Sequence, residues 1–106
     1  MIHHNDLRNC MARYPRMKTE QAAWIQSEVD RGWIVMKLNG RMTAADYSAR
    51  LAWVNNQNIA WGSCRMITSN YETYVDPCIS LLPSDAGYVV MYKLVFASDD
   101  VTVLKQ

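Results

Sequence analysis

The sequence predicts an α+β fold in which two to three N-terminal helices pack on a small, mainly antiparallel sheet of three to five strands from the C-terminal half. Two observations predict it. Apolar residues recur at helical spacing in three segments before residue 55, and each segment is bounded by residues that favour a helix end. After residue 64 the apolar residues gather instead in short runs rich in Val, Ile and Tyr, separated by turn-forming sequences.

Two helices are expected in the first 31 residues. The first covers residues 5–14 and ends at Pro15, because a proline disfavours the helical conformation of the residue before it. The second covers residues 20–31, with Thr19 as its N-cap and Gly32 in the left-handed position after its last turn. Its buried stripe is predicted to be apolar and to consist of Ala22, Ile25 and Val29, with Trp24 at the edge.

A strand and a third helix follow. Residues 33–38 are short and partly β-branched, and the turn dipeptide Asn39-Gly40 closes them, so they are predicted to form a strand. Thr43 opens the third helix, with Asp46 three residues later as in a capping box. Its predicted buried face consists of Ala44, Tyr47, Leu51 and Val54. The amide-rich residues 55–58 end this helix, because Asn favours caps and turns over helix interiors.

The C-terminal half is predicted to be mainly β. Short strands are expected at residues 65–68 and 71–75, and both contain β-branched or aromatic residues. Asp76-Pro77 marks a turn after the second of them, and residues 83–87 mark another.

The last apolar run is predicted to be the central strand of the sheet. Residues 88–97 are apolar on nearly both faces, which is typical of a strand covered on both sides. The turn of residues 98–100 leads into residues 101–104, so the two segments are expected to form a C-terminal hairpin.

The composition fits one small domain in a reducing compartment. The chain has 106 residues, of which 50% are hydrophobic and 20% charged, and it is predicted to form a single domain over residues 1–106. Cys10, Cys64 and Cys78 make an odd number at irregular spacing, which is a poor disulfide framework and indicates a cytoplasmic protein. No apolar run approaches the roughly 20 residues of a membrane span, and no signal peptide is recognisable, so a membrane partner is not expected.

No catalytic residue, metal site or cofactor site is predicted. His3 and His4 are neighbours, and neighbouring side chains point in different directions, so one ion rarely binds both. Cys64 precedes Arg65, a cation of the kind that lowers a thiol pKa, but a buried structural thiol is the preferred interpretation. The glycines stand apart and form no phosphate loop, and the acidic residues show no paired spacing. A non-enzymatic protein is therefore expected.

A DNA-binding regulator is the alternative function. Residues 42–51 resemble the first helix of a helix-turn-helix, in which a Thr cap precedes a face of small residues ending in Leu. The resemblance implies a recognition helix from about Asn56 and a wing strand at residues 88–97. Residues 56–66 contain a single basic residue and the formal net charge is +1, so the electrostatic contribution that dominates affinity for DNA is small. The basic residues that would contact nucleic acid are Arg8, Arg13, Arg16 and Lys18.

Two tryptophans flank the amide-rich segment and define the predicted partner-binding site. Large aromatic side chains beside adaptable polar groups are typical of the centres of protein interfaces. Packing of both indoles in the core is the competing interpretation and the commoner arrangement for tryptophan. The predicted site consists of Trp53, Asn55, Asn56, Gln57 and Trp61.

The function expected from the sequence is that of a small protein-interaction module. Small, near-neutral domains without catalytic motifs are common among accessory proteins of phages and other mobile elements, and anti-CRISPR-like inhibitors are one such group. By this analogy of size and chemistry, the chain is expected to inhibit host machinery by occupying the surface of another protein or protein complex. Nucleic acid is the less favoured partner.

Overall fold

The computed structural model describes residues 14–67 and 73–106, and the side chains of residues 18–66 and 73–106. In these ranges five strands form one sheet, three α-helices cover it, and every strand pair is antiparallel. The α+β prediction is confirmed. The elements are, in chain order, α2 (Tyr14–Asp30), β1 (Ile34–Leu38), β2 (Arg41–Thr43), α3 (Ala44–Asn56), β3 (Trp61–Ile67), β4 (Thr73–Leu81), the short 3₁₀ helix η1 (Pro83–Asp85), α4 (Gly87–Val95) and β5 (Val101–Leu104).

The long strand β4 organises the sheet. It pairs with β3 along one edge and with both β1 and β2 along the other, and β5 lies on the far side of β1. The elements β1, α3, β3, β4, α4 and β5 therefore follow the β-α-β-β-α-β, ferredoxin-like arrangement, in which each crossover helix joins two parallel strands that a third strand separates. Strand β2 continues the line of β1 along β4.

A matched irregularity separates β1 from β2. Gly40 has φ +102° and Asp76, opposite it in β4, has φ +46°. The Gly40 N–H donates to the Asp76 carboxylate at 2.7 Å, and the Asp76 N–H donates to the Gly40 carbonyl at 2.8 Å. The predicted end of the strand at Asn39-Gly40 is confirmed. The turn predicted at Asp76-Pro77 is wrong, because these hydrogen bonds keep both residues inside β4 as a local distortion.

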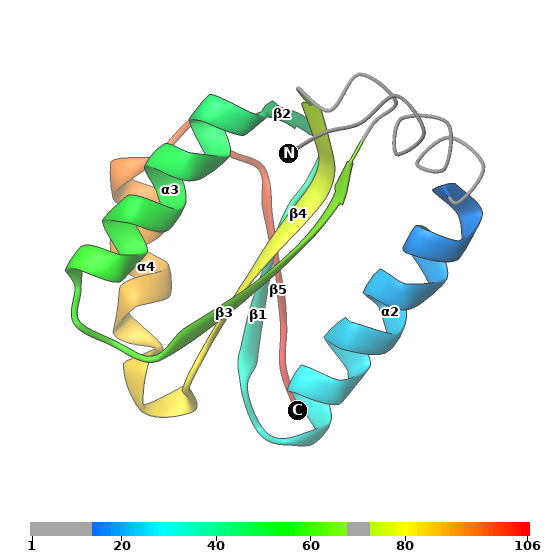
Figure 1. Ribbon diagram of the computed structural model, residues 1–106. Coiled ribbons are helices and arrows are strands. Elements are labelled where there is room, and N and C mark those ends of the chain that lie inside the picture. Colours follow the sequence, from blue (N-terminus) through cyan, green and yellow to red (C-terminus); the bar gives the residue numbers. More distant parts are fainter. Residues whose placement is uncertain (1–13, 68–72) are drawn as a thin grey trace.

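The main core lies between the sheet and the pair α3 and α4, which cover one face (Figure 1). Helix α3 begins where the sequence predicts, since Thr43 Oγ1 accepts the Asp46 backbone N–H at 3.1 Å. It buries Tyr47 and Val54, and the Tyr47 hydroxyl donates to the Cys78 carbonyl at 2.9 Å. The buried core cluster consists of Ile34, Met36, Leu38, Tyr47, Val54, Ile79, Leu81, Val89 and Tyr92.

Helix α2 covers the opposite face of the sheet (Figure 1), and its two buried side chains in the described residues, Gln21 and Glu28, are polar. The Ser80 hydroxyl donates to Glu28 Oε1 at 2.9 Å, and the Gln21 side chain donates to the Asp76 carbonyl at 3.0 Å. Glu28 also accepts a hydrogen bond from Arg31 Nε. The apolar stripe predicted for this helix is correct in part: Ile25, Val29 and the edge residue Trp24 are half-buried, but Ala22 is exposed. The buried positions are the polar Gln21 and Glu28.

The predicted boundaries of the N-terminal helices are also wrong at two points. Helix α2 begins at Tyr14, so Pro15 opens a helix instead of ending one, and Thr19 lies inside the helix instead of capping it. A proline is tolerated in the first turn because the amide hydrogen it lacks would have no partner within the helix. The left-handed conformation predicted for Gly32 is confirmed by its φ of +89°. Of the helix predicted at residues 5–14, only Tyr14 lies within the described residues.

Gly62 of β3 lies close to Ser80, its partner in β4, and to Glu28 of α2, and this predicts the effect of a methyl group there. A Cβ at Gly62 would lie 2.7 Å from Ser80 Oγ and 3.1 Å from Glu28 Oε1. Gly62→Ala is therefore expected to lower the free energy of unfolding by about 1–2 kcal/mol, as overpacking does. Gly87→Ala is the matched control, since a Cβ there meets no atom within 4 Å. Urea unfolding should show a lower midpoint for the first variant only; equal midpoints would contradict the prediction.

The prediction for the last third of the chain needs two corrections. Residues 87–95 form helix α4, so the central strand predicted at residues 88–97 is wrong, and so is the C-terminal hairpin. Lys93 is the one charged residue in this run, and a single charge does not separate period 2 from period 3.6, so the run fits a buried strand and a helix equally well. Strand β5 pairs instead with β1, from Val35 opposite Leu104 to Leu38 opposite Val101.

The predicted helix-turn-helix is absent from the described residues. The segment that would hold the recognition helix contains strand β3, and the predicted wing strand is helix α4. Of the three predicted elements of the helix-turn-helix, only the first helix is present, as α3 at residues 44–56. It packs on the sheet as a crossover helix between β2 and β3.

Candidate protein-binding surface

Helix α4 presents large apolar side chains to the outside of the molecule. Val90, Met91, Leu94 and Val95 are 61%, 45%, 75% and 55% exposed, and these four residues are called the α4 surface below. Within the described residues, they are the large hydrophobic side chains that are exposed. They lie at positions i, i+1, i+4 and i+5, so they share one side of the helix. Contiguous exposed apolar area of this kind is typical of a protein interaction site.

The opposite side of α4 holds the helix on the sheet. Val89 and Tyr92 are buried in the main core, and Phe96, which follows the helix, packs against the same core. Their spacing of three and four residues is that of a single helical face. Because this inner face of α4 packs in the core, the α4 surface points away from the sheet.

A buried ion pair fixes the C-terminal end of α4 relative to α3. Arg50 of α3 binds Asp99 through two hydrogen bonds, from Nε at 2.9 Å and from Nη2 at 2.8 Å. The Tyr92 hydroxyl of α4 donates to the same carboxylate at 2.6 Å. The side chains of Arg50 and Asp99 are only 14% and 8% exposed, so water competes little for these bonds. Three segments are joined at one carboxylate.

The titration of these groups reflects the same cluster. The hydrogen bonds from Arg50 hold the pKa of the Asp99 carboxyl below its ordinary value, against the opposing effect of burial. The pKa of Tyr92 is raised, first by burial of its hydroxyl and then by its bond to Asp99. Asp99 therefore stays charged and Tyr92 stays protonated at neutral pH, which is the pair of states that this hydrogen-bond pattern requires.

Aromatic rings fill the space between α3 and α4. Trp53 packs edge-to-face against Tyr92 and Phe96, with ring centroids 5.9 and 6.0 Å apart. The Arg50 guanidinium lies over the Phe96 ring, 4.6 Å from its centroid. These contacts and the ion pair leave α4 little freedom to rotate, so the α4 surface is presented by a rigid support.

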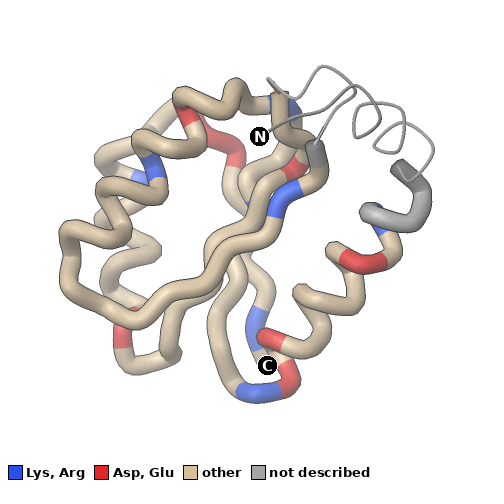
Figure 2. The backbone as a smooth tube through the Cα atoms, in the orientation of Figure 1, with Lys and Arg blue, Asp and Glu red and all other residues tan. Residues whose placement is uncertain are grey.

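The neighbouring outer face of α3 carries small side chains and little charge. Ala45, Ser48, Ala49 and Ala52 are all exposed on it. Helix α4 itself contains one charged residue, Lys93. Figure 2 shows how sparse the charged residues are along both helices. A partner could therefore approach the helical layer without having to desolvate many charges.

The structure brings together part of the site that the sequence predicts. The Trp61 indole N–H donates to the Asn55 side chain at 3.3 Å, and Gln57 donates to the Trp53 carbonyl at 2.9 Å. Asn55 and Asn56 are exposed, whereas Trp53, Gln57 and Trp61 are half-buried. The two indoles pack against the core, so their contacts are those of structural residues that hold the helical layer, and not those of exposed residues that contact a partner.

The α4 surface was missed by the sequence analysis. The available signal was the unusual apolar content of residues 88–97 itself, since a helix that is apolar all round is either buried or covered by a partner. The basic residues predicted to contact nucleic acid are not gathered by the structure: Lys18 lies exposed on α2, the side chain of Arg16 is not described, and Arg8 and Arg13 lie outside the described residues.

The remaining candidates from the sequence are the Cys64 thiol and a metal site. Burial raises the pKa of Cys64, and this effect outweighs the lowering by Arg65, so the interpretation as a structural thiol is preferred at neutral pH. Residues 14–67 and 73–106 contain no group of three or more His, Cys, Asp or Glu that could hold a metal ion. His3 and His4 lie outside these ranges.

Comparison of the chain with models of protein families, with curated proteins and with solved structures found no match. No helix in the described part of the chain combines the length and the apolar character needed to cross a membrane.

Proposed function

We propose that this chain is a non-enzymatic protein-interaction module that occupies a partner's surface with helix α4. The observation that carries the proposal is the α4 surface, whose four apolar side chains are exposed while a buried ion pair and aromatic contacts hold the helix behind them. A rigid support lowers the entropy lost on binding, so more of the contact energy is available as affinity. Inhibition of host machinery by an anti-CRISPR-like accessory protein is the setting that we propose for this mode of action.

The proposed partner is another protein that binds the α4 surface in an apolar groove with acidic groups at its rim. An amphipathic helix that inserts its apolar face into such a groove contacts it through residues one turn apart, as Val90 and Leu94 are. Lys93 is the single charge on α4 and is exposed beside these residues, so a carboxylate at the rim complements it. The absence of a second charge on the helix favours a groove over an open, polar partner surface.

Leu94→Glu is expected to abolish binding to such a partner without unfolding the chain. Leu94 is the most exposed of the four side chains, so the substitution removes no core contact and its effect on stability should stay within about 0.5 kcal/mol. A charge buried in an apolar groove should weaken binding by about 30-fold or more, the range of an interface hot spot. The measurement is affinity capture from a host lysate, identification of the retained protein, and titration of that purified protein by calorimetry.

Ser48→Glu on the exposed face of α3 is the matched control, since it adds the same charge to the same helical layer. It should leave the purified complex almost unchanged. Equal affinity of wild type and Leu94→Glu would contradict the proposal. Concentration-dependent self-association of the wild type, lost in Leu94→Glu, would also contradict it, because a second copy would then be the occupant.

A further inference from the structure

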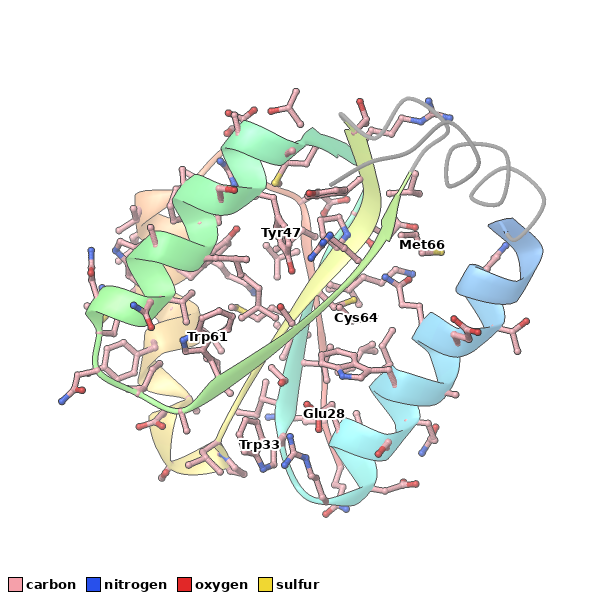
Figure 3. The ribbon with its side chains drawn as sticks, viewed as in Figure 1. Glu28, Trp33, Tyr47, Trp61, Cys64 and Met66 are labelled. Carbon is pink, nitrogen blue, oxygen red and sulfur yellow. The ribbon has the colours of Figure 1, made fainter. Side chains whose placement is uncertain are left out.

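Two of the three cysteines face each other across the β3–β4 hairpin. Cys64 of β3 and Cys78 of β4 are direct partners in the antiparallel register, and both are free thiols. Residues that are directly opposite in such a pair lie on the same face of the sheet. Gly62, two residues before Cys64, faces Glu28 and Trp24 of α2, so Cys64 (labelled in Figure 3) lies on the face that α2 covers. Its partner Cys78 lies on the same face.

We propose that Cys64 and Cys78 form a redox modification site, at which a low-molecular-mass disulfide such as oxidised glutathione converts the two thiols into a cross-strand disulfide. The site lies on the opposite face of the sheet from the α4 surface, so the inference goes beyond the proposed function and does not depend on it.

The geometry of the pair permits the bond without a change of register. Opposed residues of an antiparallel pair have Cα atoms about 4.5–5.5 Å apart. Disulfides span Cα separations of about 4.4–6.8 Å, so the backbone already holds the two cysteines within bridging range. A distortion of the ladder follows immediately, between Cys64 and Met66, where the strands can adjust to the preferred torsion of the bridge.

The difference in exposure sets the order of the two exchange steps. Cys78 is fully buried, whereas Cys64 is half-buried and can be reached from solvent. The Cys64 thiolate attacks one sulfur of the oxidant, whose S–S bond breaks, and the first small thiolate leaves. The Cys78 thiolate then attacks Cys64 Sγ, the mixed disulfide breaks, and the second small thiolate leaves. Two electrons pass from the cysteine pair to the oxidant, and the two protons that the cysteines release go to the two small thiolates.

The surroundings of the thiols make the exchange slow. Burial raises the pKa of Cys64 and raises that of Cys78 to about 12, so little thiolate is present at neutral pH. We expect conversion at the slow end of disulfide exchange, over hours. The product joins β3 to β4 on the face of the sheet that α2 covers.

The full chain incubated under native conditions with oxidised glutathione tests the proposal. The intact mass should fall by two hydrogen atoms, and the free thiols should fall from the three of the sequence to one. Trypsin cleaves after Arg50, Arg65 and Lys93, so Cys64 and Cys78 are on separate peptides and Cys10 is on a third. The expected product is a reducible cross-link between peptides 51–65 and 66–93.

Two variants and one change of condition complete the experiment. Cys10→Ser should give the same cross-link, and Cys64→Ser should give none. In denaturing urea loop closure favours the near pair Cys64 and Cys78, but bridges to Cys10 should also appear, which separates a bridge made by the fold from one made by the unfolded chain. A native product with the mixture of pairings seen in urea would overturn the proposal, and so would a stable glutathione adduct on Cys64 with no cross-link.

Discussion

Asp99→Ala should lower the free energy of unfolding by about 3 kcal/mol, which is the cost of removing one partner from a buried ion pair. The substitution removes the acceptor of the two Arg50 hydrogen bonds and of the Tyr92 hydroxyl together. Arg50 and Tyr92 are then left with donors that water can scarcely reach, because the Arg50 side chain is 14% exposed and Tyr92 is fully buried. Urea unfolding followed by tryptophan fluorescence measures the change.

Asp100→Ala is the matched control for this prediction. Asp100 is the exposed neighbour in the sequence, and the hydrogen bond that it accepts from Asn39 ends on its backbone carbonyl, which the substitution keeps. Its unfolding midpoint should therefore stay close to that of the wild type. If the two variants lose the same stability, the three-way bond at Asp99 does not hold α3 and α4 together.

The same carboxylate predicts a dependence of stability on pH. Arg50 holds the pKa of Asp99 in the folded chain below its ordinary value of 3.8. A group with a lowered folded pKa contributes stability above its unfolded pKa, and this contribution is lost as the pH falls through the folded pKa. The chain should therefore lose stability below about pH 4, and Asp99→Asn should flatten part of that fall. Unfolding curves between pH 7 and pH 2 measure it; parallel curves for the two proteins would contradict the assignment.

The sequence predicted the segments in which polar and apolar residues alternate at a clear period. Helix α3 has a capping Thr43 and buried residues at helical spacing, so its start was placed correctly. Strand β1 ends at Leu38, shortly before Gly40, whose positive φ favours glycine, and the Asn39-Gly40 turn dipeptide is visible in the sequence. Both segments are locally consistent with the fold, which is the condition for sequence-based prediction to succeed.

The segments that were missed break this local consistency for identifiable reasons. Helix α2 buries Gln21 and Glu28 against polar partners in the sheet, and partners distant in the sequence cannot be seen in a helical pattern. Helix α4 carries large apolar residues on its exposed side as well as on its buried side, so its sequence has the apolar content of a buried strand. Departures of this second kind are expected where function, instead of folding, selects the residues. Helix α4, which the sequence predicts to be a strand, is also the element on which the proposed function rests.

The cysteines show a third limit of sequence reasoning. Their odd number and wide spacing indicate no disulfide framework, yet the hairpin register places Cys64 opposite Cys78. The register depends on how β4 pairs with strands on both of its edges, and a shift of one residue would move every side chain to the other face. The pairing of Cys64 with Cys78 thus depends on the register of the sheet, and it cannot be predicted from the spacing of the two cysteines along the chain.

Glu28→Ala should loosen α2 and lower the free energy of unfolding by about 2 kcal/mol, because it leaves the fully buried Ser80 hydroxyl without its acceptor. The loss of Arg31 as a partner adds less, since the Arg31 side chain is 51% exposed and water can solvate it. Glu28→Gln separates the two contributions. The amide keeps an acceptor oxygen for Ser80 and gives up the charge, so it should cost less than half as much as the alanine.

Hydrogen exchange measures which helix loses stability in the Glu28→Ala variant. If Glu28 fastens α2 to the sheet, the alanine variant should exchange its α2 amides faster, while the amides of α4 keep their protection because the main core lies on the other face. Faster exchange in both helices would mean that the two layers unfold as one unit. Equal unfolding midpoints for the alanine and glutamine variants would mean that the charge, and not the bond to Ser80, holds the helix. The polar side of this sheet is thus expected to open independently of the apolar side that supports the α4 surface.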